Sequence, residues 1–332
     1  MIGAQDYHNL QTWLLGCQRP LIVTHRRPDG DALGAVAALA LALRTLKLDS
    51  RPALFEPFPP RYTLLEQAVS WQRWDQDRAK LTAECDALVI VDTCALSQLE
   101  DIADYLPHAP RTLVIDHHPT RDPLGQRPGD LTLFDESAGA LCLVIAEWIK
   151  TVGVPLSPVL ATALLIGIGT DCGWFRFSNA DARMLRMAAE LAEAGAPIHR
   201  LYRAIYEQDA PAKLRLIGRM LLGMELRADG KLVVMRLRRE DFTAAGADRR
   251  ATEDLVNEAG RLAGIEAILL FTEEADGQVR VNFRSKERLD VAALAQRFGG
   301  GGHARAAGAR PRGTWDEVVA HVIAETERGL VE

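Results

Sequence analysis

The feature that most constrains the fold is a series of short apolar runs, rich in β-branched residues, that alternate with helical patterns. The runs are LIVTH (21–25), SRPALFE (50–56), DALVIVD (86–92) and RTLVIDHH (111–118). Helical patterns cover 32–47, 140–153, 157–171 and 180–195. Buried strands that alternate with helices are typical of a parallel sheet covered by helices. We therefore predict an α/β fold whose N-terminal domain has a mainly parallel sheet.

The second half of the chain has a different pattern. A hairpin is predicted over 224–238 with its turn at Asp229-Gly230, followed by strands over 265–274 and 278–285. Helices are predicted over 251–263, 290–298 and 314–328. A chain of 332 residues is too long for one core. We predict an N-terminal domain (1–195), a helical connector (196–222) and a smaller α/β domain with a mixed sheet (223–332).

Charge and composition exclude several classes of protein. Acidic residues outnumber basic ones by 45 to 39, which argues against long nucleic acid as a stable partner. The N-terminus lacks the basic region of a signal peptide, and no apolar run is long enough to cross a bilayer. The five cysteines form no CxxC pair. We therefore expect a cytoplasmic protein without a membrane partner.

Acidic and imidazole side chains follow the strongest strands of the N-terminal domain. The residues are His25, Asp29 and Asp31 after the first strand, Asp92 after the third, Asp116, His117 and His118 after the fourth, and Asp171 at the end of helix 157–171. The carboxyl ends of parallel strands share one edge of the sheet, so these side chains should lie together. Buried carboxylates repel one another unless a cation is present. The pattern therefore predicts a metal site.

The types of ligand indicate the metal. Carboxylate oxygen with some imidazole and no thiolate pair favours Mn²⁺ or Mg²⁺ over structural Zn²⁺, and so many ligands favour two divalent ions. We expect Mn²⁺, with Mg²⁺ and Co²⁺ as alternatives. Taken singly, the residues have simpler interpretations: Asp92 as a turn residue and Asp31 as the N-cap of the helix that follows it. Their repetition at successive strand ends favours the metal site.

A glycine run in the C-terminal domain, GGGGHARAAG (299–308), predicts a second site. Glycines let a ligand approach the backbone and expose N–H groups, and basic residues lie nearby. The candidate substrate-binding residues are Arg284, Ser285, Lys286, Gly300, Gly301, Gly302, His303 and Arg305. We expect them to form a basic pocket for an anionic ligand.

These motifs resemble those of a known family. HRRPDGDALGA, VIVDTC, VIDHHPT and GIGTDCGWFRF are similar to the four motifs of the DHH phosphoesterase superfamily, and NFRSK with GGGGHARAAG resembles its DHHA1 domain. The resemblance covers nearly the whole chain and is greatest to the oligoribonuclease and 3′-phosphoadenosine-5′-phosphate (pAp) phosphatase branch, the nanoRNases. It implies one metal held by His25, Asp29 and Asp92. It implies a second metal held by Asp31, Asp92, His117 and Asp171.

The resemblance also implies catalytic roles and a function. Asp92 would bridge the two metals, His118 would face the phosphate, and Asp116 would orient an imidazole. The implied enzyme is a two-metal phosphodiesterase that hydrolyses oligoribonucleotides of about two to five nucleotides and dephosphorylates pAp, with the DHHA1 pocket binding a nucleotide end. Hydrolysis of cyclic di-AMP or linear pApA, single-strand exonuclease action and nucleotide binding without catalysis are the alternatives. A homodimer is also expected.

Overall fold

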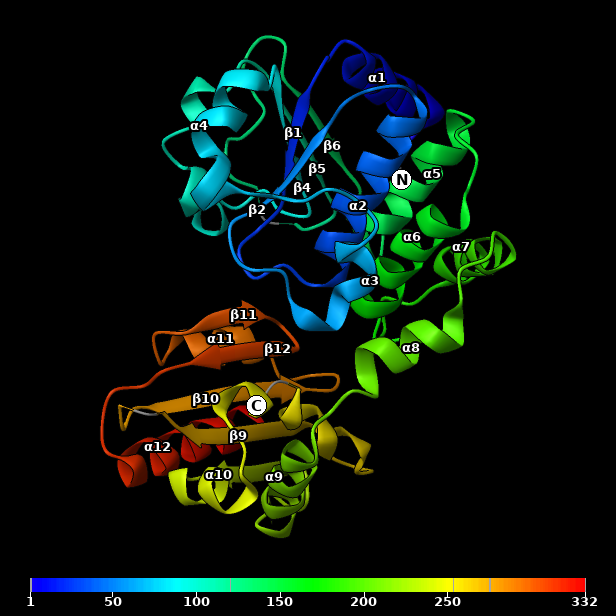
Figure 1. Cartoon of the computed structure of the whole chain (residues 1–332). Coiled ribbons are helices and arrows are strands. Elements are labelled where there is room, and N and C mark those ends of the chain that lie inside the picture. The colour runs from blue at the N-terminus through cyan, green and yellow to red at the C-terminus, as the bar shows by residue number, and fades with distance from the viewer. Residues whose placement is uncertain (1, 120, 253, 275, 332) are drawn as a thin grey trace. The chain divides into compact units, whose positions relative to one another are not determined.

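The computed structural model describes residues 2–119, 121–252, 254–274 and 276–331, and the chain forms two compact units, Met1–Gln208 and Asp209–Glu332 (Figure 1). The first unit has a six-stranded sheet in the order β3-β2-β1-β4-β5-β6, with every neighbouring pair parallel. Its strands are β1 (Pro20–Val23), β2 (Arg51–Leu54), β3 (Gln72–Arg73), β4 (Ala87–Val91), β5 (Thr112–Asp116) and β6 (Leu131–Phe134). The predicted parallel sheet is thus confirmed, and the two strands that were not predicted, β3 and β6, are short strands at its edges.

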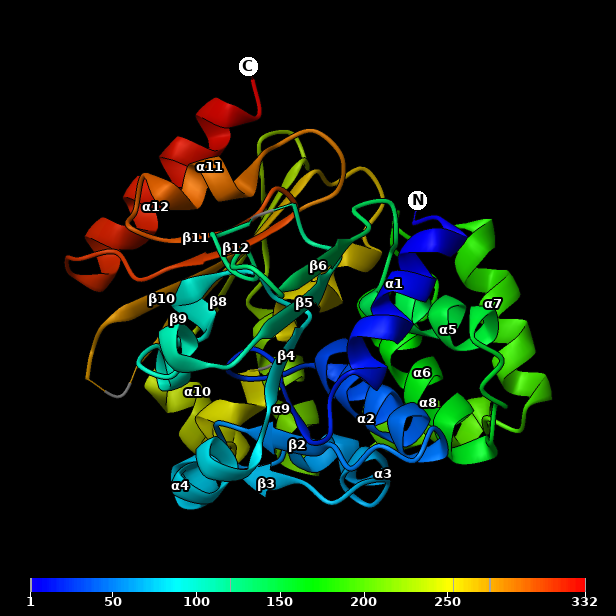
Figure 2. The same ribbon diagram turned by 90° about the horizontal axis from the view of Figure 1, so that it is seen from above.

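Helices cover both faces of this sheet. They are α1 (Ala4–Leu15), α2 (Gly30–Thr45), α3 (Thr63–Glu66), α4 (Trp74–Glu84), α5 (Leu141–Thr151), α6 (Pro158–Asp171), α7 (Ala182–Glu193) and α8 (Ile198–Tyr206), with single 3₁₀ turns η1 (Pro60–Tyr62), η2 (Leu96–Gln98), η3 (Glu100–Ile102) and η4 (Leu106–His108). In Figure 2, α2, α5 and α6 lie together on one side of β4 and β5. Alternate strand residues face opposite ways: Ile22 and Val89 pack in the core with these helices, while Leu21 and Leu88 pack with α4.

Two glycines let α2, α5 and α6 approach closely. A Cβ atom on Gly34 of α2 would lie 2.6 Å from the carbonyl oxygen of Ala163, and one on Gly167 of α6 would lie 2.2 Å from Cys142 Sγ. Both positions are buried within the helix layer. The close packing brings the start of α2 against the end of α6, which places Asp31 and Asp171 next to each other.

The second unit has a mixed six-stranded sheet in the order β11-β12-β10-β9-β8-β7. Only β8 and β9 are parallel; the other pairs are antiparallel. The strands are β7 (Glu225–Arg227), β8 (Leu232–Leu237), β9 (Ala267–Glu273), β10 (Val279–Ser285), β11 (Gly301–His303) and β12 (Ala306–Ala309). The helices are α9 (Pro211–Leu222), α10 (Arg239–Ala245), α11 (Val291–Gln296) and α12 (Trp315–Gly329). The predicted mixed sheet and the hairpin around Asp229-Gly230 are confirmed.

One predicted helix of this unit is wrong. The segment 251–263 contains the 3₁₀ helices η5 (Arg249–Thr252) and η6 (Leu255–Arg261) instead of an α-helix. Asp254 has a φ of 65°, in the left-handed region, which an α-helix cannot continue through. Among the described residues, no helix combines the length and apolar character needed to cross a membrane.

Candidate functional site

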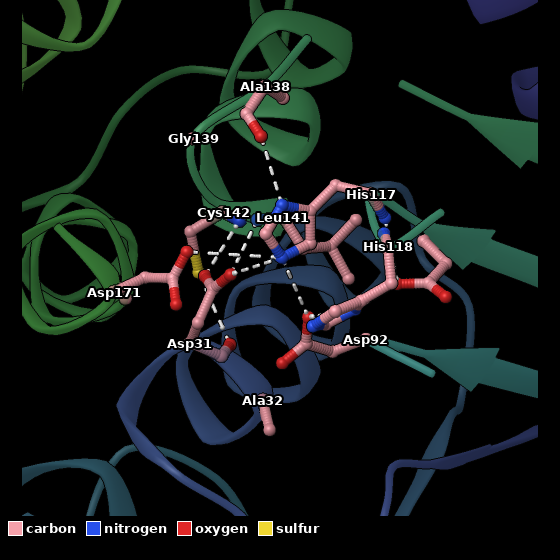
Figure 3. Close-up of polar contacts among 12 residues, drawn as sticks. Asp31, Ala32, Asp92, His117, His118, Ala138, Gly139, Leu141, Cys142 and Asp171 are labelled. Atoms are coloured by element: carbon pink, nitrogen blue, oxygen red, sulfur yellow. Dashed lines mark hydrogen bonds and ion pairs between the residues drawn. The ribbon is translucent and has the colours of Figure 1, made fainter. Parts of the chain in front are cut away.

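The acidic and imidazole residues predicted from the strand ends converge at one edge of the parallel sheet. Three groups of ligand atoms each lie within 4.8 Å of one another: His25–Asp29–Asp92, Asp31–His117–Asp171 and Asp92–His117–His118. Figure 3 shows Asp31 of α2, Asp171 of α6, Asp92 just after β4 and His117 just after β5 directed toward one another. The sharing of Asp92 and His117 between groups makes this one continuous cluster.

The two aspartates at the start of α2 have different partners. Asp29, not Asp31, is the N-cap: its Oδ1 accepts hydrogen bonds from the backbone N–H groups of Asp31 and Ala32, both at 3.0 Å. The simpler interpretation of Asp31, as the N-cap, is therefore wrong. The buried Asp31 carboxylate instead accepts from the backbone N–H groups of Leu141 at 2.5 Å and Cys142 at 2.9 Å (Figure 3). These are the first N–H groups of α5, a helix terminus that favours an anion.

Backbone carbonyls fix the ring orientation of two histidines. His25 Nδ1 lies 2.8 Å from the carbonyl oxygen of Arg26, and His117 Nδ1 lies 2.9 Å from that of Ala138. A carbonyl accepts only, so each Nδ1 carries a hydrogen and Nε2 is the atom directed at the carboxylates. Ala138 could not be found from the sequence, because a backbone carbonyl carries no residue-type signal.

Asp116 orients His118. The Asp116 carboxylate is fully buried, and its Oδ1 accepts from His118 Nδ1 at 2.8 Å and from the backbone N–H of His117 at 2.7 Å. The His118 side chain is 35% exposed, the largest exposure among the three imidazoles. The carboxylate therefore fixes the orientation of the His118 ring through Nδ1.

Asp92 lies at the centre of the cluster under unusual constraints. It has a φ of 64°, a left-handed conformation that glycine, asparagine and aspartate adopt more easily than other residues. Its side chain is 3% exposed, and Oδ1 makes no hydrogen bond with any described residue. His117 Nε2 is the nearest imidazole nitrogen to that oxygen, at 3.4 Å, and His25 Nε2 lies 3.7 Å from Oδ2. A buried carboxylate oxygen without a hydrogen bond, among further carboxylates and imidazoles, fits a bound divalent cation.

The pKa shifts of Asp31 and Asp171 agree with this, whereas the His117 and His25 imidazoles outweigh burial and lower the pKa of Asp92 to about 2. Burial raises the pKa of Asp171 to about 7, with Asp29 and Asp92 adding to the shift although His117 opposes it. Burial also raises the pKa of Asp31 well above its usual value, and Asp92 and Asp171 add to the effect. Burial alone would lower the pKa of His117, but Asp92 and Asp31 outweigh it and raise the value to about 10. Without metal, the cluster must hold extra protons to limit its repulsion.

The thiols near the cluster have other partners. Cys94 and Cys172 donate to the backbone oxygens of Asp122 and Ile168. Burial raises the pKa of Cys142 well above its usual value, and Asp31 raises it further. The donor set is therefore carboxylate oxygen and imidazole nitrogen, which is the set that Mn²⁺ and Mg²⁺ accept.

The predicted substrate-binding residues of the second unit also lie together. Arg284 and Ser285 end β10, and Arg284 pairs with Ala306 across the β10–β12 ladder. Arg305 precedes β12 and donates to Ser285 Oγ at 3.4 Å. The remaining candidates are Lys286 after β10, Gly300 before β11, and Gly301, Gly302 and His303 in β11, an edge strand beside β12. The side chain of His303 lies outside the described part of the structure.

Neutral oxygens hold the three basic side chains of this region. Arg284 Nε donates to Asn257 Oδ1 at 3.0 Å, Lys286 Nζ to the Leu262 carbonyl at 2.8 Å, and Arg305 Nη1 to the Leu289 carbonyl at 2.9 Å. Such bonds orient the side chains and leave their positive charge in place. The positions of these residues are thus compatible with an anion-binding surface.

Two of the glycines have a structural reason to be glycine. A Cβ atom on Gly300 would lie 2.1 Å from the carbonyl oxygen of Gly308, and one on Gly302, whose φ is 144°, would lie 2.4 Å from that of Ala306. Gly301 has open space where its Cβ would be. Gly300 and Gly302 therefore serve the close pairing of β11 with β12, whereas Gly301, at the sheet edge, has room for a side chain.

Comparisons with known proteins agree with the motifs. The model of the DHH family, N-terminal domain, matches residues 19–168, and that of the DHHA1 domain matches 229–327. A bifunctional oligoribonuclease and PAP phosphatase of Thermus thermophilus is 31% identical over 294 residues, which cover 88% of this chain and 84% of that protein. A cyclic-di-AMP phosphodiesterase of Geobacillus thermodenitrificans is 26% identical over 89% of this chain and 45% of its own.

One solved structure has the same fold. An exopolyphosphatase-related protein from Bacteroides fragilis superimposes with a TM-score of 0.92, covering 100% of this chain and 99% of that one at 22% identity. At that identity the likeness concerns the fold alone. The domain matches and the Thermus relative carry the assignment: the chain belongs to the DHH family and carries the accompanying DHHA1 domain, as its motifs predicted.

Proposed function

We propose that the chain is a metal-dependent phosphodiesterase that hydrolyses oligoribonucleotides of about two to five nucleotides to mononucleotides and also dephosphorylates pAp to AMP. The observation that carries the proposal is the convergence of His25, Asp29, Asp31, Asp92, His117, His118 and Asp171 at one sheet edge. The Thermus relative, named as a bifunctional oligoribonuclease and PAP phosphatase, supports this choice of substrates.

We assign two divalent ions, preferably Mn²⁺, to two overlapping sets of side chains in this cluster. We assign one ion to His25, Asp29 and Asp92, and the other to Asp31, Asp92, His117 and Asp171. When bound, such a pair supplies an activated water and positive charge for the phosphate oxygens. Asp92 belongs to both ligand sets, which is consistent with the hydrogen-bond-free Oδ1. The carbonyls of Arg26 and Ala138 hold each ligand imidazole with Nε2 toward the metal position.

The chain's own residues then position and protonate the substrate. His118, held through Nδ1 by Asp116, directs Nε2 to the phosphate and donates its proton to a phosphate oxygen or to the leaving oxygen. Asp116 is a positioning residue, since its contact is with the imidazole. The proposed roles need His118 at the exposed side of the cluster, in agreement with its partial exposure.

In the second unit, we assign Arg284, Ser285, Lys286, Arg305 and the Gly300–His303 segment to a nucleotide end. Arg284 and Lys286 are oriented by neutral oxygens and keep their charge for a phosphate. The open position at Gly301, at the edge of the sheet, exposes backbone to a ligand.

Product analysis with labelled RNAs tests the proposal. Substrates of two to about ten nucleotides, pAp and cyclic di-AMP are incubated with the protein and Mn²⁺, with EDTA as the control. We expect the shortest RNAs to give mononucleotides, pAp to give AMP, and EDTA to stop both reactions. Faster cleavage of cyclic di-AMP would favour the alternative enzyme, progressive trimming of long RNA would favour an exonuclease, and binding without cleavage would leave only a nucleotide-binding protein.

A further inference from the structure

Two adjacent arginines in the loop between β1 and α2 have different environments. Arg26 is bound on three sides: its Nη1 lies 2.7 Å from Glu100 Oε2, its Nε lies 3.0 Å from Asp101 Oδ2, and its N–H donates to the Gln98 carbonyl. Arg27 is exposed and makes no hydrogen bond, ion pair or ring contact within the described residues. The contacts of Arg26 therefore hold the loop in place, and the Arg27 guanidinium is available to bind a ligand.

The backbone does not explain an arginine at position 27. Its φ is 52°, a left-handed conformation that glycine, asparagine and aspartate adopt most easily. The peptide bond before it is fixed, because the Arg26 carbonyl accepts from His25 Nδ1. A long side chain kept in this conformation, without a partner among the described residues, suggests a partner outside the protein.

The position of Arg27 identifies the chemistry of that partner. It lies midway between His25 and Asp29, two members of one ligand group, and two peptide units span at most about 7 Å. An anion held at this group is therefore within reach of the guanidinium. Despite the carboxylates nearby, Arg27 forms no ion pair with any described residue in the free protein. A guanidinium suits a tetrahedral phosphate, since its planar fork donates two parallel hydrogen bonds to non-bridging oxygens.

We propose that Arg27 binds the phosphate group undergoing hydrolysis, donating to its non-bridging oxygens from the rim of the His25–Asp29–Asp92 group. This inference rests on the proposed phosphoesterase function but not on the identity of the nucleotide. Because the contact is with the reacting phosphate, its loss should affect every substrate, including a small chromogenic phosphodiester such as bis(p-nitrophenyl) phosphate. That behaviour separates Arg27 from Arg284, whose loss should affect nucleotide substrates only.

Arg27→Ala and Arg27→Lys test the proposal, with Arg186→Ala as the matched control. Arg186 is also exposed and has no partner among the described residues, but it lies on α7, away from the ligand groups. We expect Arg27→Ala to lower kcat/KM by about 10- to 100-fold on pApA and on the chromogenic diester alike, Arg27→Lys to lower it less, and Arg186→Ala to leave it unchanged.

Two measurements besides turnover complete the test. By calorimetry, the affinity of the Mn²⁺-loaded protein for inorganic phosphate should fall in Arg27→Ala, while the affinity for Mn²⁺ itself stays at the wild-type value. Arg27→Gly, which removes the side chain and relieves the left-handed backbone, should be as inactive as Arg27→Ala but more stable to heat. Wild-type phosphate affinity, a loss confined to nucleotides, or weakened Mn²⁺ binding in Arg27→Ala would each overturn the inference. If the wild type hydrolyses no nucleotide, the proposed function fails, and the phosphate-binding measurement still tests Arg27.

Discussion

Replacement of Asp171 by asparagine tests whether the acidic cluster destabilises the metal-free protein and stabilises the metal-bound protein. The substitution keeps the shape of the side chain and removes one charge. In the metal-free protein the pKa of Asp171 rises from 3.8 to about 7, mainly through burial, so the folded state resists ionisation of this carboxyl group. A shift of this size corresponds to about 4 kcal/mol, because each pKa unit is worth about 1.4 kcal/mol.

The expected effect has a defined pH dependence. A group whose pKa is raised by folding stabilises the fold below its unfolded pKa and loses that contribution as the pH rises through the folded value. With EDTA present, wild type and Asp171→Asn should therefore be about equally stable near pH 3.5, below the ordinary pKa of 3.8. At pH 8 the variant should be more stable. Since the side chain is 26% exposed, solvent screening reduces the difference, and we expect about 2 kcal/mol, or roughly 4–8 °C in Tm.

Metal should reverse the order of stability. Thermal unfolding is followed at both pH values with EDTA and with saturating Mn²⁺. Bound metal stabilises the folded state more in the protein that binds it more tightly. We expect Mn²⁺ to raise the Tm of wild type well above that of the variant. A variant that is less stable than wild type at pH 8 in EDTA would refute the reasoning. Such a result would mean that the attraction between Asp171 and His117, whose charged atoms are 3.9 Å apart, outweighs burial and repulsion.

Three further substitutions test the site and its packing. Asp92→Ala removes the ligand shared by both proposed metals, so turnover should fall to background and calorimetry should detect weaker Mn²⁺ binding; an active, metal-loaded variant would exclude the shared role. Gly167→Ala places a Cβ within 2.2 Å of Cys142 Sγ and should lower the free energy of unfolding in urea by about 1–3 kcal/mol. Gly218→Ala, in the interior of α9 with open space around it, should raise that free energy by about 0.5–1 kcal/mol. The reverse order of stability would contradict the packing account. Arg284→Ala should raise KM for dinucleotides several-fold and spare the small chromogenic diester, and equal loss on both substrates would argue against nucleotide recognition.

The sequence by itself predicted the chemistry of the candidate site. Each strong apolar run of the first unit became a strand, and the polar residues after it had to emerge at the carboxyl edge of a parallel sheet. That rule is enough to group His25, Asp92 and His117, because it depends only on strand direction. The motif spacing likewise identified the family, which the domain matches confirm.

Tertiary structure alone decided how each candidate ligand side chain is held. Asp31 accepts from Leu141 and Cys142, more than a hundred residues away, and His117 is oriented by the carbonyl of Ala138. These partners are backbone N–H and C=O groups, which every residue type except proline carries in the same form, so no residue pattern can indicate them. The different roles of Arg26 and Arg27 were also beyond the sequence. Both side chains are exposed, and which guanidinium meets Glu100 depends on the path of the loop in space.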